Sequence, residues 1–160
     1  MAIRNLRYEG DEILRKKSRE IEVIDDRIKE LAEDMFDTMH KYDGLGLAGV
    51  QVGILKRIIV IDLYDDVSKF CLINPEIVEK SEETVELEEG CLSYPNQFGK
   101  VVRSTKVKVK ALDLNGKKVT LEAEGLLAQA LQHEIDHLNG EVFKDKILPG
   151  TFEIITPQEN

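Results

Sequence analysis

Two histidines and a glutamate stand together near the end of the sequence, as His133-Glu134-Ile135-Asp136-His137. In a helix, residues four apart project from the same face, so both imidazoles would point in one direction. Two neutral imidazoles at this spacing bind a metal, and the glutamate between them takes a proton from the water that the metal activates. A lone buried histidine is more often a hydrogen-bonded core residue, but a pair that flanks a glutamate favours a metal site.

These residues lie in a stretch, 125–140, that is expected to form one buried helix. Its apolar residues cover most of the helix circumference, and Asn139-Gly140 provides a suitable end, because either residue adopts the left-handed conformation. Burying several polar side chains in such a helix is costly unless they have partners. A metal ion would supply that partner.

A catalytic site of this type uses three protein ligands and leaves one position for water. Cys91 is the best third candidate, because it lies in a turn-rich segment between strands and thiolates bind transition metals strongly. Cys71 lies in an apolar strand and is expected to be an inert core thiol. A third histidine in the extended zinc motif is excluded, because Phe143 occupies its position. Glu153 or Glu159 would be a weak alternative.

The remaining chain is expected to supply one further helix and several strands. An amphipathic helix is predicted from about Asp25 to Tyr42, with His40 on its surface and not a ligand. Strands are predicted over 57–63, 70–74 and 85–88, the last with Val85 and Leu87 facing the core.

A hairpin is predicted over residues 105–124, around a two-residue turn at Asn115-Gly116. The pattern favours an α+β fold, with antiparallel or mixed β-sheets packed around a central buried helix that carries H-E-x-x-H. We expect residues 1–160 to form a single catalytic domain.

Composition narrows the class of protein. A net charge of −9 argues against direct nucleic-acid binding and against anionic membranes. The longest apolar run, 58–61, is far too short to span a bilayer, and the first ten residues lack the apolar stretch of a signal peptide. Two cysteines make no disulfide framework, so a cytoplasmic location is expected.

Three motifs occur in one order: Gly44-x-Gly46-Leu47-Ala48-x-x-Gln51, Glu89-Gly90-Cys91-Leu92-Ser93 and His133-Glu134-x-x-His137. Together they closely resemble peptide deformylase, over roughly residues 5 to 148. The resemblance implies a metallohydrolase that removes the formyl group from N-formylmethionine of newly synthesised proteins and releases formate. Its partners would be N-formylmethionyl nascent peptides.

The resemblance also implies roles for individual residues. The metal ligands would be Cys91, His133 and His137, and Glu134 would be the general base and acid. The side-chain amide of Gln51 and the backbone N–H of Leu92 would stabilise the oxyanion. The metal would be one divalent ion, ferrous iron in the cell, with nickel, cobalt or zinc able to substitute.

The substrate peptide would bind as an added strand, with the methionine side chain in an apolar pocket. The substrate-binding positions are Leu45, Gly46, Leu87, Glu89, Leu126 and Ala130. Gly46 would let the backbone approach the substrate closely. An ion pair between Glu89 and Arg103 would hold the cysteine loop.

Three features depart from the family pattern. Gly49 replaces the usual alanine and is expected to loosen Gln51, and Phe98 stands where some bacterial members carry arginine. The C-terminal tail lacks the basic helix that longer members use to dock on the ribosome, so ribosome binding by that route is not expected.

Two other functions compete. Residues 44–49 match the G-x-G-x-x-G dinucleotide fingerprint, but they follow a helix and leave no room for a crossover helix. The second alternative is a catalytically silent paralogue that binds metal and formyl-peptides. Retention of Glu134 argues against it, because only catalysis explains that residue well.

Overall fold

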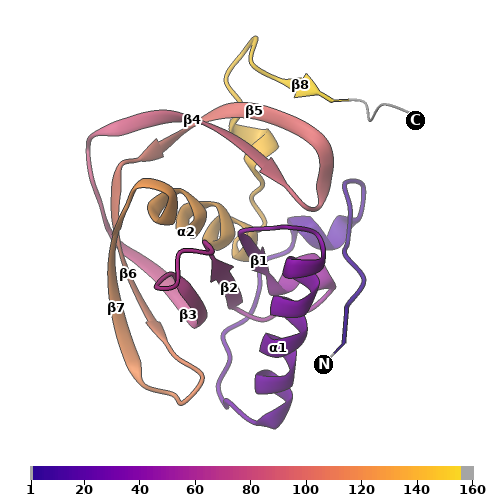
Figure 1. Cartoon of the computed structure of the whole chain (residues 1–160), viewed down its shortest axis with the longest axis vertical. Helices are drawn as coiled ribbons and strands as arrows, with labels where there is room; N and C mark the ends of the chain where they lie inside the picture. The colour runs from indigo at the N-terminus through magenta and orange to yellow at the C-terminus, as the bar shows by residue number, and fades with distance from the viewer. Residues whose placement is uncertain (1, 156–160) are drawn as a thin grey trace.

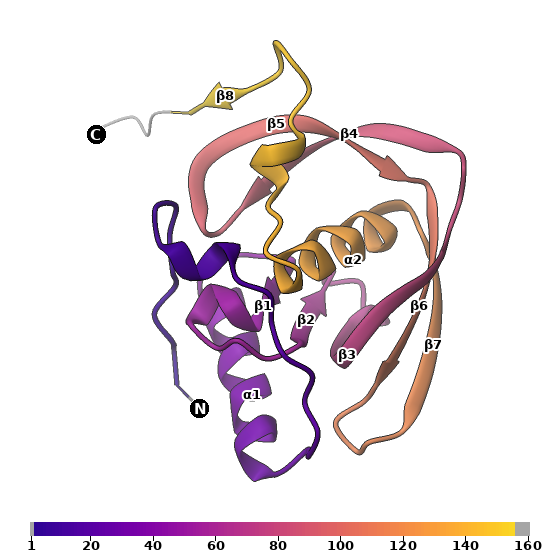
Figure 2. The same cartoon turned by 180° about the vertical axis from the view of Figure 1, so that it is seen from behind.

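The computed structural model describes residues 2–155, which form two sheets around one buried helix (Figures 1 and 2). The first sheet has five strands in the order β1-β2-β3-β6-β7, and the second has three in the order β4-β5-β8. The paired strands are antiparallel throughout. Their bounds are β1 Gly46–Ala48, β2 Ile58–Asp62, β3 Lys69–Lys80, β4 Thr84–Cys91, β5 Tyr94–Ser104, β6 Lys106–Leu112, β7 Lys118–Glu124 and β8 Glu153–Ile154.

Helix α2 (Gly125–Leu138) lies between the two sheets and contacts strands of both (Figure 1). Every residue from 131 to 138 is buried. The helix ends at Asn139, and Gly140 follows with φ +75°, against the backbone carbonyl of Arg15. These observations confirm the predicted buried helix and its C-terminal stop. The α+β class with antiparallel sheets is also confirmed.

Helix α1 (Asp26–Lys41) packs against β1 and β2, away from α2. Asp25 caps it, since its carboxylate accepts a hydrogen bond from the Ile28 N–H. Strand β2 is buried at all five positions because α2 covers one face of the sheet and α1 the other. The described part of the chain also contains three short 3-10 helices: η1 (Glu12–Arg15), η2 (Gly49–Val52) and η3 (Phe143–Lys146).

Several details of the strands differ from expectation: β3 continues to Lys80, beyond the predicted 70–74, and β1 and β8 were not predicted. Val85 is 37% exposed, and it is the second residue of β4, where it pairs with Arg103. The buried residue on the same face of this strand is Glu89. Strand β5 was not predicted, because polar residues and Pro95 obscure its alternation.

The hairpin between β6 and β7 forms, but its turn is longer than two residues. The Asp113 N–H bonds to the Lys117 carbonyl and Gly116 has φ +79°, so three residues form the loop. This arrangement, with glycine in the left-handed position, is a common three-residue hairpin loop. No helix within residues 2–155 is long and apolar enough to cross a membrane.

Candidate active site

Cys91, His133 and His137 converge at the point where α2 passes the end of β4. Cys91 is the last residue of β4, and the two histidines lie one turn apart on α2. The Cys91 Sγ lies 3.3 Å from His137 Nε2, and one donor atom from each of the three residues lies within 4.8 Å of the others. The structure therefore brings together the three side chains that the sequence singled out as metal ligands.

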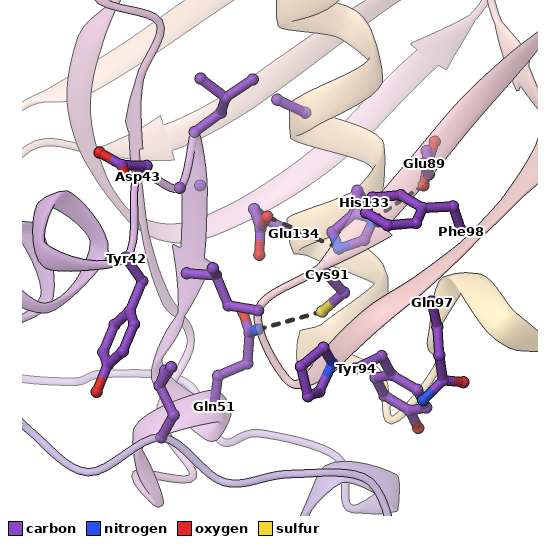
Figure 3. Close-up of a pocket in the computed structure, with 18 of the residues that line it drawn as sticks. Tyr42, Asp43, Gln51, Glu89, Cys91, Tyr94, Gln97, Phe98, His133 and Glu134 are labelled. Carbon is purple, nitrogen blue, oxygen red and sulfur yellow. Dashed lines mark hydrogen bonds and ion pairs between the residues drawn. The ribbon is translucent and has the colours of Figure 1, made fainter. Parts of the chain in front are cut away.

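A buried carboxylate orients the first histidine. Glu89 Oε1 lies 2.8 Å from His133 Nδ1, so this nitrogen donates and Nε2 is left to face the cysteine. Arg103 donates to both Glu89 oxygens at 2.7 and 2.8 Å. Burial would raise the pKa of Glu89, but the hydrogen bonds from Arg103 and His133 outweigh it and lower that pKa to about 2. Glu89 is thus an anion that holds His133 in one orientation (Figure 3).

The buried charge network continues beyond the predicted ion pair. Arg103 also donates to Asp136 Oδ2 at 2.7 Å, and Lys146 reaches the same oxygen at 2.9 Å. Sequence reasoning paired Arg103 with Glu89 alone. The residue Asp136 inside the histidine motif was the available signal, because a carboxylate in a buried helix requires a cationic partner.

Glu134 is buried beside His133 and faces the same centre. Burial raises the pKa of its carboxyl to about 7. Its Oε2 lies 3.9 Å from His133 Nε2, and its Oε1 has no hydrogen-bond partner among the described residues. Gly46 lies directly against this carboxylate, because a Cβ placed on it would be 2.6 Å from Oε2.

Gln51 approaches the cluster from the other side. It lies on η2, is almost fully buried, and accepts a hydrogen bond on Oε1 from the Ala48 N–H. Its Nε2 donates to Ser93 Oγ at 3.1 Å and to Cys91 Sγ at 3.4 Å (Figure 3). The amide group is therefore aimed at the cysteine end of the site.

A cavity of about 880 Å³ opens onto these residues. Its wall includes most of the predicted substrate-binding positions: Leu45, Gly46, Glu89, Leu126 and Ala130. Leu92 also lines it. Leu87 is half-buried opposite Val101 and is not among the lining residues, so its role stays a prediction.

Other candidates lie elsewhere. His40 is not simply a surface residue, because its Nε2 lies 2.8 Å from Asp62 Oδ2, but it is outside the cluster that could hold a metal. Burial raises the pKa of Cys71 to about 12, as expected of an inert thiol. Glu153 is exposed on β8, and Glu159 lies outside the described residues.

Comparison with known proteins agrees with this site. The model of the polypeptide deformylase family matches residues 3–152. The chain belongs to this family. A peptide deformylase of Clostridium perfringens is 57% identical over 145 residues, which is 91% of this chain and 98% of that protein. One from Finegoldia magna is 53% identical over 92% of this chain and 91% of that protein.

Solved deformylase structures share the fold. The Thermotoga maritima enzyme has a TM-score of 0.90 at 42% identity and covers 93% of this chain and 100% of its own. That of Ehrlichia chaffeensis, in complex with actinonin, has a TM-score of 0.89 at 44% identity, over 93% and 91%. Polypeptide deformylases are metal-dependent hydrolases that remove N-formyl groups from nascent peptides.

The structure explains one departure from the deformylase pattern. A Cβ on Gly49 would lie 2.9 Å from the Ile58 side chain and 3.0 Å from two backbone carbonyls. The structure therefore leaves little room for a side chain at position 49. The Gln51 side chain is hydrogen-bonded to the Ala48 N–H and to Ser93 Oγ. The expectation that Gly49 loosens the amide stays a prediction.

The other departure alters the cavity wall. Phe98 lines the cavity beside His133 (Figure 3), and its ring covers Gly90, where a Cβ would lie 2.7 Å away. An apolar ring thus forms this part of the cavity wall.

Proposed function

We propose that this chain hydrolyses the formyl amide of N-formylmethionyl peptides with Cys91, His133 and His137 as metal ligands and Glu134 as proton carrier. The observation that carries the proposal is the convergence of one thiol, two imidazoles and a carboxylate with raised pKa at the end of a deep cavity. We infer that the substrates are nascent chains in the cytoplasm.

The donor set fits a divalent metal. One thiolate and two imidazoles are donors that such metals take in proteins, and the three must lie close together to hold one ion. The distance from Cys91 Sγ to His137 Nε2 is 3.3 Å. Burial lowers the pKa of His137 well below its ordinary value, which favours the neutral imidazole that coordination requires. The pKa of His133 is raised well above its ordinary value in spite of burial, by Glu134, Cys91 and Glu89, so a metal would have to displace its proton. A divalent metal held there would activate a water for attack and polarise the formyl carbonyl.

Glu134 would carry the proton. A carboxyl group with a pKa of about 7 both accepts and returns a proton near neutral pH. Its unpartnered Oε1 is free to accept a proton from the attacking water. The same group would then donate that proton to the amino nitrogen that leaves as formate is released.

Gln51 and Leu92 would stabilise charge on the formyl oxygen. The Gln51 amide already donates toward Cys91, and the Leu92 N–H lies in the adjacent turn between β4 and β5. Preorganised donors of this type are each worth a factor of about 10²–10³ in kcat.

The apolar part of the cavity would take the methionine side chain. Leu45, Leu126 and Ala130 line it, and Leu126 is half exposed and accessible to a ligand. Glu89 lines the same cavity, but its oxygens are engaged by Arg103 and His133. Its role would be to orient the histidine and the loop that carries Cys91.

The choice of metal is also a proposal. A thiolate with two imidazoles suits ferrous iron, nickel, cobalt and zinc, and we propose iron as the cellular metal.

Replacement of Glu134 by glutamine tests the assignment. Glu134→Gln should retain one metal per chain and lose turnover of a formyl-Met-Ala-Ser peptide by several hundredfold, because it removes a proton-transfer contribution of about 10²–10⁴. Glu141→Gln, an exposed glutamate just after α2, is the matched control and should keep full activity. Equal activity of the two variants would overturn the role of Glu134.

A metal-bound wild-type protein that binds formyl-peptide but releases no formate would favour the silent paralogue. The close contacts at Gly49 and the hydrogen bonds of Gln51 argue for the active enzyme.

A further inference from the structure

The N-terminal residues Leu6–Glu9, here called the bridging segment, bond to both chain segments that carry the proposed oxyanion donors. The Arg7 N–H donates to the Gln51 carbonyl at 2.7 Å, and the Glu9 N–H donates to the Ser93 carbonyl at 2.9 Å. The two N–H groups come from residues only two apart in the chain, and each bonds to a different segment. The segment lies alongside the turn between β4 and β5 (Figures 1 and 2).

These bonds close a ring. Gln51 Nε2 donates to Ser93 Oγ at 3.1 Å, which joins the two segments directly. Gln51 follows β1 of the five-stranded sheet, whereas Ser93 lies in the turn of the three-stranded sheet. The bridging segment is therefore a backbone link between two sheets that each contribute one donor.

Side chains hold the bridging segment in place. Leu6 is 7% exposed and packs into the core beside α1. The Glu9 carboxylate accepts hydrogen bonds from Gln97 Nε2 at 2.8 Å and from Lys144 Nζ at 2.6 Å. Arg7 pairs with Asp11 at 2.9 Å. A segment anchored at both ends can hold its two N–H groups at a set separation.

We propose that the bridging segment is a positioning element that sets Gln51 relative to Leu92 during formyl transfer to water. This inference rests on the proposed function. When the Gln51 amide turns to the developing oxyanion, it gives up the bond to Ser93 Oγ, and that bond is the direct link between the two segments. The backbone link through Arg7 and Glu9 remains, and it holds the donors within the roughly 0.5 Å that catalytic geometry tolerates.

Two substitutions at one position isolate the backbone donor. Glu9→Ala removes the side-chain anchors and keeps the N–H, whereas Glu9→Pro removes the N–H as well. Relative to Glu9→Ala, Glu9→Pro should lower kcat about tenfold, less than the 10²–10³ for loss of a whole donor. KM and metal content should change less than twofold, because the methionine pocket and the ligands are untouched.

A second pair of variants tests the ring itself. Arg7→Pro should lower kcat as Glu9→Pro does, relative to Arg7→Ala. Because both substitutions open the same ring, the double proline variant should lose no more than the worse single variant. Fully additive losses, or a Glu9→Pro variant with the kcat of Glu9→Ala, would overturn the inference.

Hydrogen exchange tests the inference without any variant. The amides of Arg7 and Glu9 in the wild-type protein should exchange at least tenfold more slowly than those of an unstructured peptide, as bonded amides do. Unprotected amides would overturn the inference even where a proline variant fails to fold. If neither the wild type nor Glu9→Ala releases formate while both amides are protected, the proposed function fails instead.

Discussion

Substitution of Gly46 by alanine should displace the proton carrier while leaving the metal site intact. A Cβ on Gly46 would lie 2.6 Å from Glu134 Oε2, 2.9 Å from its Cγ and 3.0 Å from its Cδ. Gly46 has no positive φ, so the added methyl introduces no backbone strain at this position. The three atoms nearest to the added methyl all belong to Glu134, so displacement of this carboxylate is the main expected effect.

The size of the effect follows from these distances. Carbon atoms pack at about 3.5–4.0 Å, so the Glu134 side chain must withdraw by roughly 0.6–1 Å. A misplacement of about 1 Å in a catalytic group costs on the order of 10²-fold in rate. We therefore expect Gly46→Ala to lower kcat about a hundredfold. Metal content should stay at the wild-type level, because the three atoms nearest to the new methyl all belong to Glu134 and none to a proposed ligand.

The assay is formate release at saturating peptide, with metal counted in the same sample. A shorter acid provides the matched control: Glu134→Asp withdraws the carboxylate from Gly46, so adding Gly46→Ala to it should cost little further. A Gly46→Ala protein with kcat within twofold of wild type would refute the reasoning. The same holds if the two substitutions prove fully additive, since they would then not share one contact.

Three further results are expected. Once a chelator has removed the metal, iodoacetamide at pH 8 should alkylate Cys91 but not Cys71, because burial raises the pKa of the Cys71 thiol to about 12. Mass spectrometry of the peptides would identify the alkylated cysteine, and alkylation of Cys71 in place of Cys91 would contradict this expectation. Arg103→Met should lower the free energy of unfolding by about 3–5 kcal/mol in urea titrations, because it removes the cation that bonds both Glu89 and Asp136 and leaves Asp136 with Lys146 alone. Asp34→Asn should lower stability above about pH 5, and the difference from wild type should shrink as pH falls below about 4. Burial would raise the pKa of Asp34, but hydrogen bonds from a backbone N–H and from Arg4 outweigh it and lower that pKa. The stabilising effect of Asp34 is therefore complete above the unfolded pKa and lost in acid. A stability difference between Asp34→Asn and wild type that grew in acid would contradict this.

The central helix and the metal ligands were predictable because their signals are local. The four-residue spacing of His133 and His137 follows from helix geometry, and Asn139-Gly140 marks the helix end. Cys91 was identified because competing ligands fail on position or surroundings. Each of these inferences uses side-chain types that the sequence displays directly.

The contacts that support the site were less predictable because they depend on tertiary structure. The bond from His133 to Glu89 joins residues 44 apart and requires the packing of α2 against β4. The contact between Gly46 and Glu134 likewise depends on how β1 meets α2. Residues 1–22 gave little signal, yet Arg7 contacts Gln51 through a backbone N–H, a group that every residue except proline carries.

Formate release should be measured with wild-type protein purified without oxygen, and the bound metal should be quantified in the same sample. The account predicts ready turnover of formyl-Met-Ala-Ser with about one divalent metal per chain, and loss of turnover in proportion to metal removed by a chelator. A fully metallated protein that binds the peptide and releases no formate would contradict it.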